Sequence, residues 1–332
     1  MGVRGLAGWI HWAAASSVKT PVWEHFRGKC VGLDVLGFLY KAKAQKCDPI
    51  AYLGSFIAAA NHSGIRLVAV FDGKPPEAKR NTVGQRSAAK MALQATKHTL
   101  QHDLAIVSMS NECKAVLESK VRALDSSINY LTAEERNRAK QLCYACGVLP
   151  LNACGEADTV LTYFMKQNII EAIISNDYDY LTRGVETLLV PEGLALPGGS
   201  LSWKMYNLSA ILKTVKFTYN NFVEMCVLMG CDYTHGELSL PYKTAYWAIK
   251  YRGAIEYTLQ HYAISNIMPY KTAVNLYTGS ESDRYSLMGE KQWLKLNEPI
   301  RVEPEALATF RSIELASLSD SEYTLLYRGT CQ

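Results

Sequence analysis

The amino-acid sequence predicts an α/β fold in which a mainly parallel central sheet is flanked by helices. Three short apolar runs each lead into a carboxylate: Lys29–Leu33 before Asp34, Arg66–Phe71 before Asp72, and Glu171–Asn176 before Asp177. Runs of this length, rich in Val and Ile, are typical of buried strands. Helical spacing of apolar residues marks the segments Ala51–Asn61, Ala133–Cys146 and Ala157–Lys166. The alternation of strands and helices predicts a parallel sheet covered by helices.

The remaining segments are expected to add helices to this core and not to form a second domain. Gly73–Tyr130 has no convincing strand and shows helical spacing, so we expect a helical insertion between two strands. From Asn220 onward the pattern is helical and tyrosine-rich, with breaks at Gly230–Asp232 and Pro241. Without repeats or linkers we expect a single composite domain over residues 1–332, divided into an N-terminal region (1–86), an insertion (87–130), an internal region (131–235) and a C-terminal region (236–332).

Composition excludes several classes of protein. The 332 residues are 48% hydrophobic and 20% charged, which suits a sizeable core and argues against a disordered, collagen-like or coiled-coil chain. No apolar run reaches the roughly 18 residues of a membrane span, so we expect no membrane partner. Nine cysteines without a recognisable secretory leader favour reduced, intracellular thiols. The lone pair Cys143 and Cys146 favours buried thiols over a zinc site.

Acids that follow parallel strands predict a shared site. In open sheets of this kind, ligands gather beyond the carboxyl ends of the strands. A single such aspartate would more often cap a helix or begin a turn. Here an acid follows one predicted strand after another, and this recurrence favours a shared site in which the acids converge.

Positive charge is concentrated in one segment. The formal net charge of +4 is too small to identify a nucleic-acid-binding protein. Between Lys74 and Leu100, however, six lysine or arginine residues stand against a single acid, Glu77. Alone, this cluster fits a solvated face as well as a phosphate-binding surface.

Five motifs together resemble those of the structure-specific 5′ nucleases of the flap endonuclease and XPG type. They are Met1–Leu6, Phe71–Pro76, Gly155–Asp158, Asn176–Asp179 and Met229–Tyr233, and they follow the family's order over roughly residues 1 to 250. The resemblance implies a PIN-like 5′ nuclease fold in which the insertion forms a helical arch.

The resemblance also implies one acidic active site. Matched position by position, its metal ligands are Asp34, Asp72, Glu156, Asp158, Asp177, Asp179 and Asp232. Carboxylates gathered in one cleft repel one another and stay ionised only with cations among them, and all-oxygen ligands favour hard ions. We therefore expect two Mg²⁺ ions, with Mn²⁺ as a substitute, which would activate a water and neutralise the leaving oxygen of a phosphodiester.

The division of ligands follows the resemblance as well. It assigns Asp72, Glu156 and Asp158 chiefly to the first ion, and Asp177, Asp179 and Asp232 chiefly to the second, with Asp34 acting through water. Asp158 stands where the family usually has Glu, so we expect altered metal affinity with activity retained. Because Glu156 and Asp158 are two residues apart, both can face the site only at the entrance to a helix.

Other positions are expected to contact the substrate. Lys79 and Arg86 are seven residues apart, share a helix face and match paired basic residues that grip the scissile phosphate; we count them with Asp179 as catalytic. Tyr40 matches an aromatic that stacks on a base, and Gly2 matches a small residue close to the substrate. The expected DNA-binding set also includes Lys74, Arg80 and Lys243.

The chain departs from the family downstream. Where relatives have a glycine hairpin that grips duplex DNA, Ser239–Ala245 lacks both glycines, so residues 236–332 resemble a degenerate helix-two-turn-helix region. The interval between Asp34 and Asp72 is shorter than in cellular flap endonucleases, which hold a 3′ flap there. Glu322–Gln332 shows no clamp-binding motif. This build suits a virus-encoded member that works as a monomer, in the host nucleus or at a cytoplasmic replication site.

The leading expectation is a Mg²⁺-dependent flap endonuclease and 5′–3′ exonuclease acting on DNA with 5′ flaps or other branched junctions in replication, repair or recombination. An RNA-cleaving endoribonuclease of the same superfamily is the first alternative, because the basic residues do not distinguish the two nucleic acids. A catalytically weak DNA-binding scaffold is the second, although every acidic position is occupied. A junction resolvase is neither required nor excluded.

Overall fold

The computed structural model describes residues 2–21, 23–74, 80–105, 111–127, 131–192, 202–234, 239–264, 266–279, 288 and 304–313. The strands are β1 (Val18–Lys19), β2 (Cys30–Asp34), β3 (Arg66–Phe71), β4 (Leu149–Asn152), β5 (Ala172–Ile174), β6 (Thr187–Glu192) and β7 (Ser202–Asn207). The helices are α1 (Leu6–Ala13), α2 (Val35–Ala44), α3 (Pro49–His62), α4 (Arg80–Leu104), α5 (Asn111–Ser127), α6 (Ala133–Ala145), α7 (Ala157–Lys166), α8 (Asp179–Thr182), α9 (Leu208–Val215), α10 (Tyr219–Leu228), α11 (Tyr242–Arg252), α12 (Ile255–His261), α13 (Met268–Thr278) and α16 (Pro304–Ile313). Two 3-10 turns, η1 (Ala15–Ser17) and η2 (Trp23–Phe26), lie near the N-terminus.

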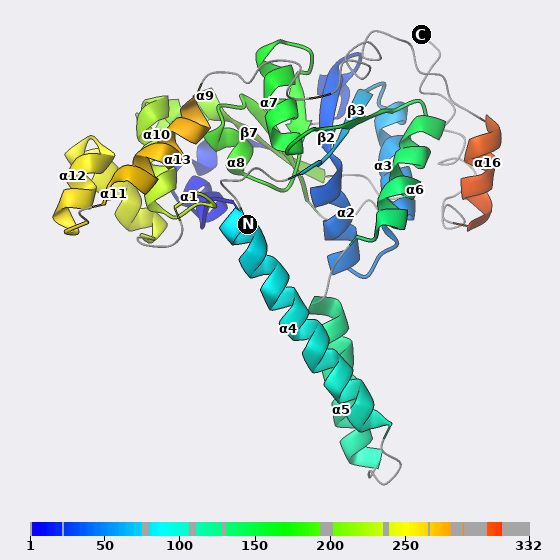
Figure 1. The fold of residues 1–332 in the computed structure, drawn as a ribbon. Coiled ribbons are helices and arrows are strands. Elements are labelled where there is room, and N and C mark those ends of the chain that lie inside the picture. The colour runs from blue at the N-terminus through cyan, green and yellow to red at the C-terminus, as the bar shows by residue number, and fades with distance from the viewer. Residues whose placement is uncertain are drawn as a thin grey trace.

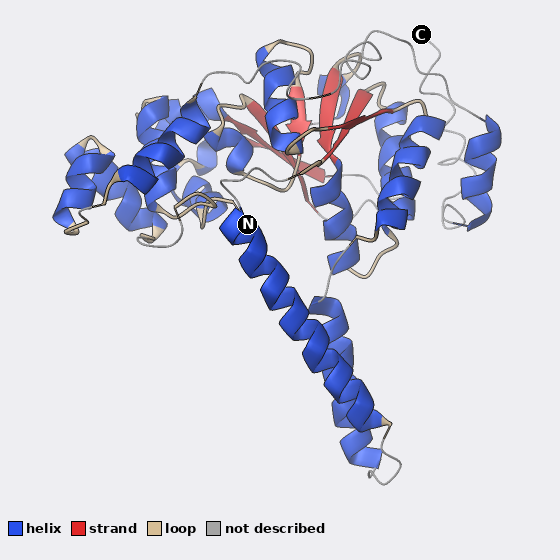
Figure 2. Cartoon of the chain, viewed as in Figure 1, coloured by secondary structure: helices blue, strands red, loops and turns tan. Residues whose placement is uncertain are grey.

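The described strands form one mixed, mostly parallel sheet in the order β1-β7-β6-β5-β2-β3-β4. β7 runs antiparallel to β6 and β1, and the other neighbours are parallel. The three strands predicted from apolar runs are confirmed as β2, β3 and β5, which are neighbours in the sheet. Figure 2 shows the strands of this sheet in red, with helices around them. The prediction missed β1, β4, β6 and β7, because polar residues or proline interrupt their apolar runs.

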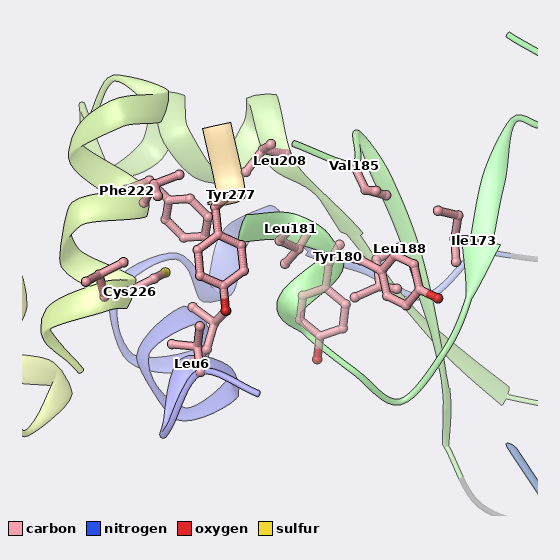
Figure 3. Packing of buried hydrophobic residues seen from close by; sticks show 14 of the residues in the cluster. Leu6, Ile173, Tyr180, Leu181, Val185, Leu188, Leu208, Phe222, Cys226 and Tyr277 are labelled. Atoms are coloured by element: carbon pink, nitrogen blue, oxygen red, sulfur yellow. The ribbon is translucent and has the colours of Figure 1, made fainter. Parts of the chain in front are cut away.

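Both faces of the sheet are buried, which explains the continuous apolar runs. Along β3, Leu67, Ala69 and Phe71 pack with α2, α3, α6 and α16, while Val68 and Val70 pack on the opposite face with α1, α7, α9, α10 and α13. Figure 3 shows part of this second cluster, where Tyr277 lies near Leu181 and Phe222. The elements that carry the candidate site are therefore fixed by core packing.

The insertion is helical, as predicted. α4 and α5 pack against each other and project away from the sheet as a hairpin (Figure 1). The first helix begins at Arg80, so the expected boundary between residues 86 and 87 falls inside α4. No proline breaks the sequence between Arg80 and Leu104, so nothing there ends or starts a helix at residue 87.

The C-terminal helices α10 to α13 gather beside α1 (Figure 1). The predicted breaks are confirmed, since α10 ends at Leu228 and α11 begins directly after Pro241. Within the part of the chain that the structure describes, no helix is long and apolar enough to cross a membrane.

Candidate active site

A cavity of about 420 Å³ opens at the carboxyl ends of β2, β3 and β5. All seven predicted metal ligands line it: Asp34, Asp72, Glu156, Asp158, Asp177, Asp179 and Asp232. Gly2 and Tyr40, predicted to contact the substrate, line it as well. The predicted convergence of the acids is thus confirmed, while their roles as metal ligands stay a prediction.

Asp34 stands at the end of β2 and immediately precedes α2. The Ser175 hydroxyl, at the end of β5, donates a hydrogen bond to Asp34 Oδ2 at 2.8 Å. Burial, followed by the negative charges of Asp72, Asp177 and Asp158, raises the pKa of Asp34 to about 7. Both the low polarity around Asp34 and the neighbouring carboxylates therefore oppose its ionisation.

Asp72 is positioned by close packing of the loops that follow β3 and β4. The Gly73 N–H donates to the Gly155 carbonyl at 2.6 Å, and the Ala157 N–H donates to Asp72 Oδ1 at 2.6 Å. A Cβ at Gly73 would collide with the Ala153 carbonyl oxygen, so this approach requires glycine.

Glu156 and Asp158 lie at the start of α7, which confirms the position expected from their spacing. Glu156 is the N-cap residue and Asp158 is in the first turn. The N–H groups of the first helical turn have no partner within the helix, so they favour acids both at the N-cap and in the first turn.

Asp177 and Asp179 follow β5 in a tight turn. The Ser175 hydroxyl accepts the Asp177 N–H at 3.1 Å, and Asp177 Oδ1 accepts the Asp179 N–H at 3.0 Å. This turn directs two carboxylates from one short segment to the cavity that they line.

Asp179 is buried and holds the N-terminal segment against the site. Its Oδ1 accepts the Val3 N–H at 2.5 Å, and its Oδ2 accepts the Tyr277 hydroxyl at 3.0 Å. Burial and the charge of Asp179 raise the pKa of Tyr277 well above its ordinary value, so this hydroxyl remains a donor. A Cβ at Gly2 would collide with the Asp179 carboxylate, which explains why a residue without a side chain stands there.

Asp232 is carried by the loop that follows α10. Gly230 adopts a φ of 92°, and its carbonyl accepts the Arg4 N–H at 3.0 Å. The Cys231 N–H donates to Thr234 Oγ1 at 3.2 Å. The first bond ties the Asp232 loop to the same N-terminal segment that contacts Asp179, and the second lies within the loop itself.

Arg183, whose side chain is 11% exposed, pairs with two of the acids and was not identified from the sequence. Nη2 of Arg183, which follows α8, lies 2.8 Å from Asp158 Oδ2 and 3.9 Å from Glu156 Oε2. Burial opposes the charge of Arg183, but Asp158, Tyr233, Tyr277 and Glu156 together outweigh this effect, and the pKa of Arg183 is raised. Arg183 follows Asp179 by four residues, about one helical turn, and this spacing is the signal that sequence reasoning missed.

Tyr277 is the other missed residue, and no sequence signal points to it. It comes from α13, 98 residues beyond the aspartate that it contacts. Only the tertiary fold brings the two together.

The other predicted substrate contacts are distributed more widely than Gly2 and Tyr40, which line the cavity. The Tyr40 side chain is 42% exposed, and Lys74 is exposed just beyond Asp72. Lys243 is exposed on α11, where its Nζ lies 5.4 Å from the Trp12 ring centroid, and it does not line the cavity. Arg80 is the first residue of α4, and Arg86 follows it by six residues. Lys79 falls outside the described residues.

The donor set fits a hard divalent cation. The predicted ligands offer only carboxylate oxygens, and the raised pKa of Asp34 shows that added positive charge would stabilise their ionised forms. As the side chains stand, no three acidic, histidine or cysteine residues in the described ranges converge tightly enough to hold an ion. Binding therefore requires the carboxylates to draw together, and Asp158 and Glu156 to share or leave Arg183.

Cys143 and Cys146, the other pair considered for a metal, are free and buried. Burial raises the pKa of Cys143 to about 12, which disfavours the thiolate that zinc requires. The prediction of buried thiols is confirmed.

Comparison with known proteins gives two family matches. Residues 1–93 match the XPG N-terminal domain, and residues 147–232 match the XPG I-region. The chain is 26% identical over 318 residues to Flap endonuclease 1 of Entamoeba histolytica, which covers 90% of this chain and 81% of that protein. It is 24% identical over 307 residues to Flap endonuclease 1 of Caenorhabditis elegans, covering 85% and 75% respectively.

Solved structures share the fold. The catalytic core of Rad2 in complex with DNA substrate superposes with a TM-score of 0.65 at 17% identity, covering 98% of this chain and 99% of that one. Flap endonuclease-1 from Methanococcus jannaschii gives 0.63 at 18% identity, covering 99% of each chain. The Holliday junction-resolving enzyme GEN1 in complex with product DNA and a Mg²⁺ ion gives 0.59 at 15% identity, covering 94% of this chain and 72% of that one.

Proposed function

Because this chain belongs to the XPG and flap endonuclease family of structure-specific 5′ nucleases, we propose that it is a Mg²⁺-dependent flap endonuclease and 5′–3′ exonuclease that hydrolyses phosphodiesters in branched DNA. The single observation that carries this proposal is the convergence of seven carboxylates on one cavity at the carboxyl edge of the sheet. A protein that only bound DNA would have no need for so costly a concentration of negative charge.

In the proposed reaction the cleft acids hold two divalent ions. Such ions supply Lewis-acid stabilisation of the charge that develops on the phosphate and lower the pKa of water. Asp72, Glu156 and Asp158 would serve one ion and Asp177, Asp179 and Asp232 the other, with Asp34 acting through water. The bonds from Ala157, Ser175, Val3 and Tyr277 hold these carboxylates in place.

Substrate contacts complete the proposal. Lys79 and Arg86 would neutralise the scissile phosphate, and the exposed ring of Tyr40 at the cavity would stack on the adjacent base. Lys74, Arg80 and Lys243 would contact the DNA backbone, and Gly2 leaves room beside Asp179. The solved structures of Rad2 with DNA substrate and of the Holliday junction-resolving enzyme GEN1 with product DNA and a Mg²⁺ ion support a branched-DNA substrate and this metal.

The test is cleavage of a labelled 5′-flap DNA in Mg²⁺ and in EDTA, beside single-stranded, duplex and four-way junction DNA. Asp179→Asn serves as the control for contaminating nucleases, because Asn has the size of Asp, its Oδ1 can still accept the Val3 N–H, and its Nδ2 can donate to the Tyr277 hydroxyl oxygen. We expect Mg²⁺-dependent incision near the flap base by the wild type and none by the variant.

A matched RNA flap belongs in the same experiment. Cleavage of RNA alone would replace the proposal with an endoribonuclease. Flap binding without any cleavage in Mg²⁺ or Mn²⁺ would replace it with a DNA-binding scaffold.

A further inference from the structure

Arg183 places a permanent positive charge inside the acidic cleft. Its side chain is 11% exposed, and those of its partners Asp158 and Glu156 are 14% and 20% exposed. The 2.8 Å contact between Arg183 Nη2 and Asp158 Oδ2 is an ion pair largely shielded from water, so solvent and salt screen it less than a surface ion pair.

The surroundings of Arg183 hold the guanidinium in this position. Nη2 donates to the Tyr233 hydroxyl at 2.9 Å, and the guanidinium carbon lies 5.7 Å from the Tyr277 ring centroid. The two tyrosine rings pack edge to face with centroids 5.3 Å apart. Arg183 is therefore seated between aromatic side chains of the C-terminal part and the start of α7, unlike a mobile surface cation.

This placement sets up competition. Glu156 and Asp158 are expected to ligate a divalent ion, yet their carboxylates already face a guanidinium that cannot lose its proton. An ion that takes these oxygens must either displace Arg183 or bind beside its charge, and both weaken binding. The same guanidinium also offsets the mutual repulsion of the acids.

We propose that Arg183 is a positioning residue that competes with a divalent ion for Glu156 and Asp158, so that this side of the cleft binds its ion more weakly than the side formed by Asp177, Asp179 and Asp232. The inference rests on the metal-dependent site of the proposed function. It predicts that the protein binds two ions with unequal affinity. Substitution of Arg183 by a neutral side chain should reduce the difference between the two affinities.

The test is titration of the full-length protein with Mn²⁺, followed by the electron paramagnetic resonance signal of the free ion. The wild type should show a tighter and a weaker class of bound ion. Arg183→Met, which keeps length and removes charge, should tighten the weaker class about tenfold or more. Arg183→Lys, which keeps the charge, should stay within about threefold of the wild type. A merely structural role would leave Mn²⁺ affinity unchanged or lower it, and either result in Arg183→Met would overturn the proposal.

Loss of Arg183 removes an ion-pair partner from two half-buried acids, so folding requires its own control. Asp158→Asn and the double variant Asp158→Asn with Arg183→Met provide it, because the double variant removes both charges of the Arg183–Asp158 pair. In the Asp158→Asn background, removal of Arg183 should change Mn²⁺ affinity much less than in the wild type, and an equal change would contradict the competition.

The outcome also separates this inference from the proposed function. Mg²⁺-dependent cleavage with unaltered Mn²⁺ affinity in Arg183→Met would refute the inference alone. Absence of both Mn²⁺ binding and cleavage in the wild type would refute the two together.

Discussion

Asp34 gives the sharpest quantitative prediction, because its protonation should control stability when no divalent ion is present. Burial and neighbouring acids raise its pKa to about 7, against 3.8 for a free aspartate. Between these values the folded chain binds a proton that the unfolded chain has lost. The resulting stabilisation is complete below about pH 4 and is lost as the pH rises through about 7.

The perturbation is Asp34→Asn, which cannot titrate and can still accept the Ser175 hydroxyl. From these pKa values, the Asp34 contribution to the free energy of unfolding falls by about 2–3 kcal/mol between pH 5 and pH 8. Between pH 5 and pH 8, the free energy of unfolding of the wild type should therefore fall by this amount relative to that of Asp34→Asn. At pH 8 the variant should therefore be the more stable protein in EDTA.

The assay is urea unfolding followed by circular dichroism at several pH values in EDTA, repeated in excess Mg²⁺. Mg²⁺ should favour the wild type, because ionised Asp34 contributes to attraction of the cation. Parallel pH profiles of the two proteins in EDTA would refute the electrostatic reasoning.

Three further substitutions test the geometry of the cleft. Gly2→Ala should abolish cleavage, because its Cβ would meet the Asp179 carboxylate, whereas Gly84→Ala on α4, where a Cβ meets nothing within 4 Å, should leave the cleavage rate unchanged. Tyr277→Phe should cost about 1–3 kcal/mol in the free energy of unfolding and slow cleavage, since it removes the donor to buried Asp179; an unchanged urea midpoint would contradict this. Tyr40→Ala should weaken flap binding by about 1–3 kcal/mol while Tyr40→Phe retains it, as fluorescence anisotropy would show; equal losses would point to the hydroxyl group instead of stacking.

The sequence predicted the centre of the fold well because the signal was local. β2, β3 and β5 are continuous apolar runs, each followed by an acid, and burial on both faces of the sheet produces that pattern. β4 and β7 were missed because Pro150 and polar residues break the pattern, and their strand conformation depends on pairing with β3 and β6.

In the candidate site, too, some residues could be found from the sequence and others only from the tertiary structure. Strand topology predicted that Asp34, Asp72 and Asp177 meet, because each follows a parallel strand. The other four acids, Glu156, Asp158, Asp179 and Asp232, were found only through the resemblance of their motifs to those of the family. Arg183 and Tyr277 were missed because their contacts depend on how α8 and α13 pack on the core. Hydrophobic spacing identifies which helix face is buried, but it does not state which acid a buried tyrosine or arginine will meet.

The most direct test of the central claim is the single-turnover cleavage rate of a 5′-flap DNA by wild type, Asp72→Asn and Glu134→Gln in Mg²⁺, with flap affinity measured in EDTA. Glu134 is an exposed acid on α6 and is the matched control. The account predicts that Asp72→Asn lowers the rate by about 100-fold or more, that its flap affinity does not weaken, and that Glu134→Gln matches the wild type. An Asp72→Asn protein that cuts at the wild-type rate would contradict the claim that this cleft is the active site.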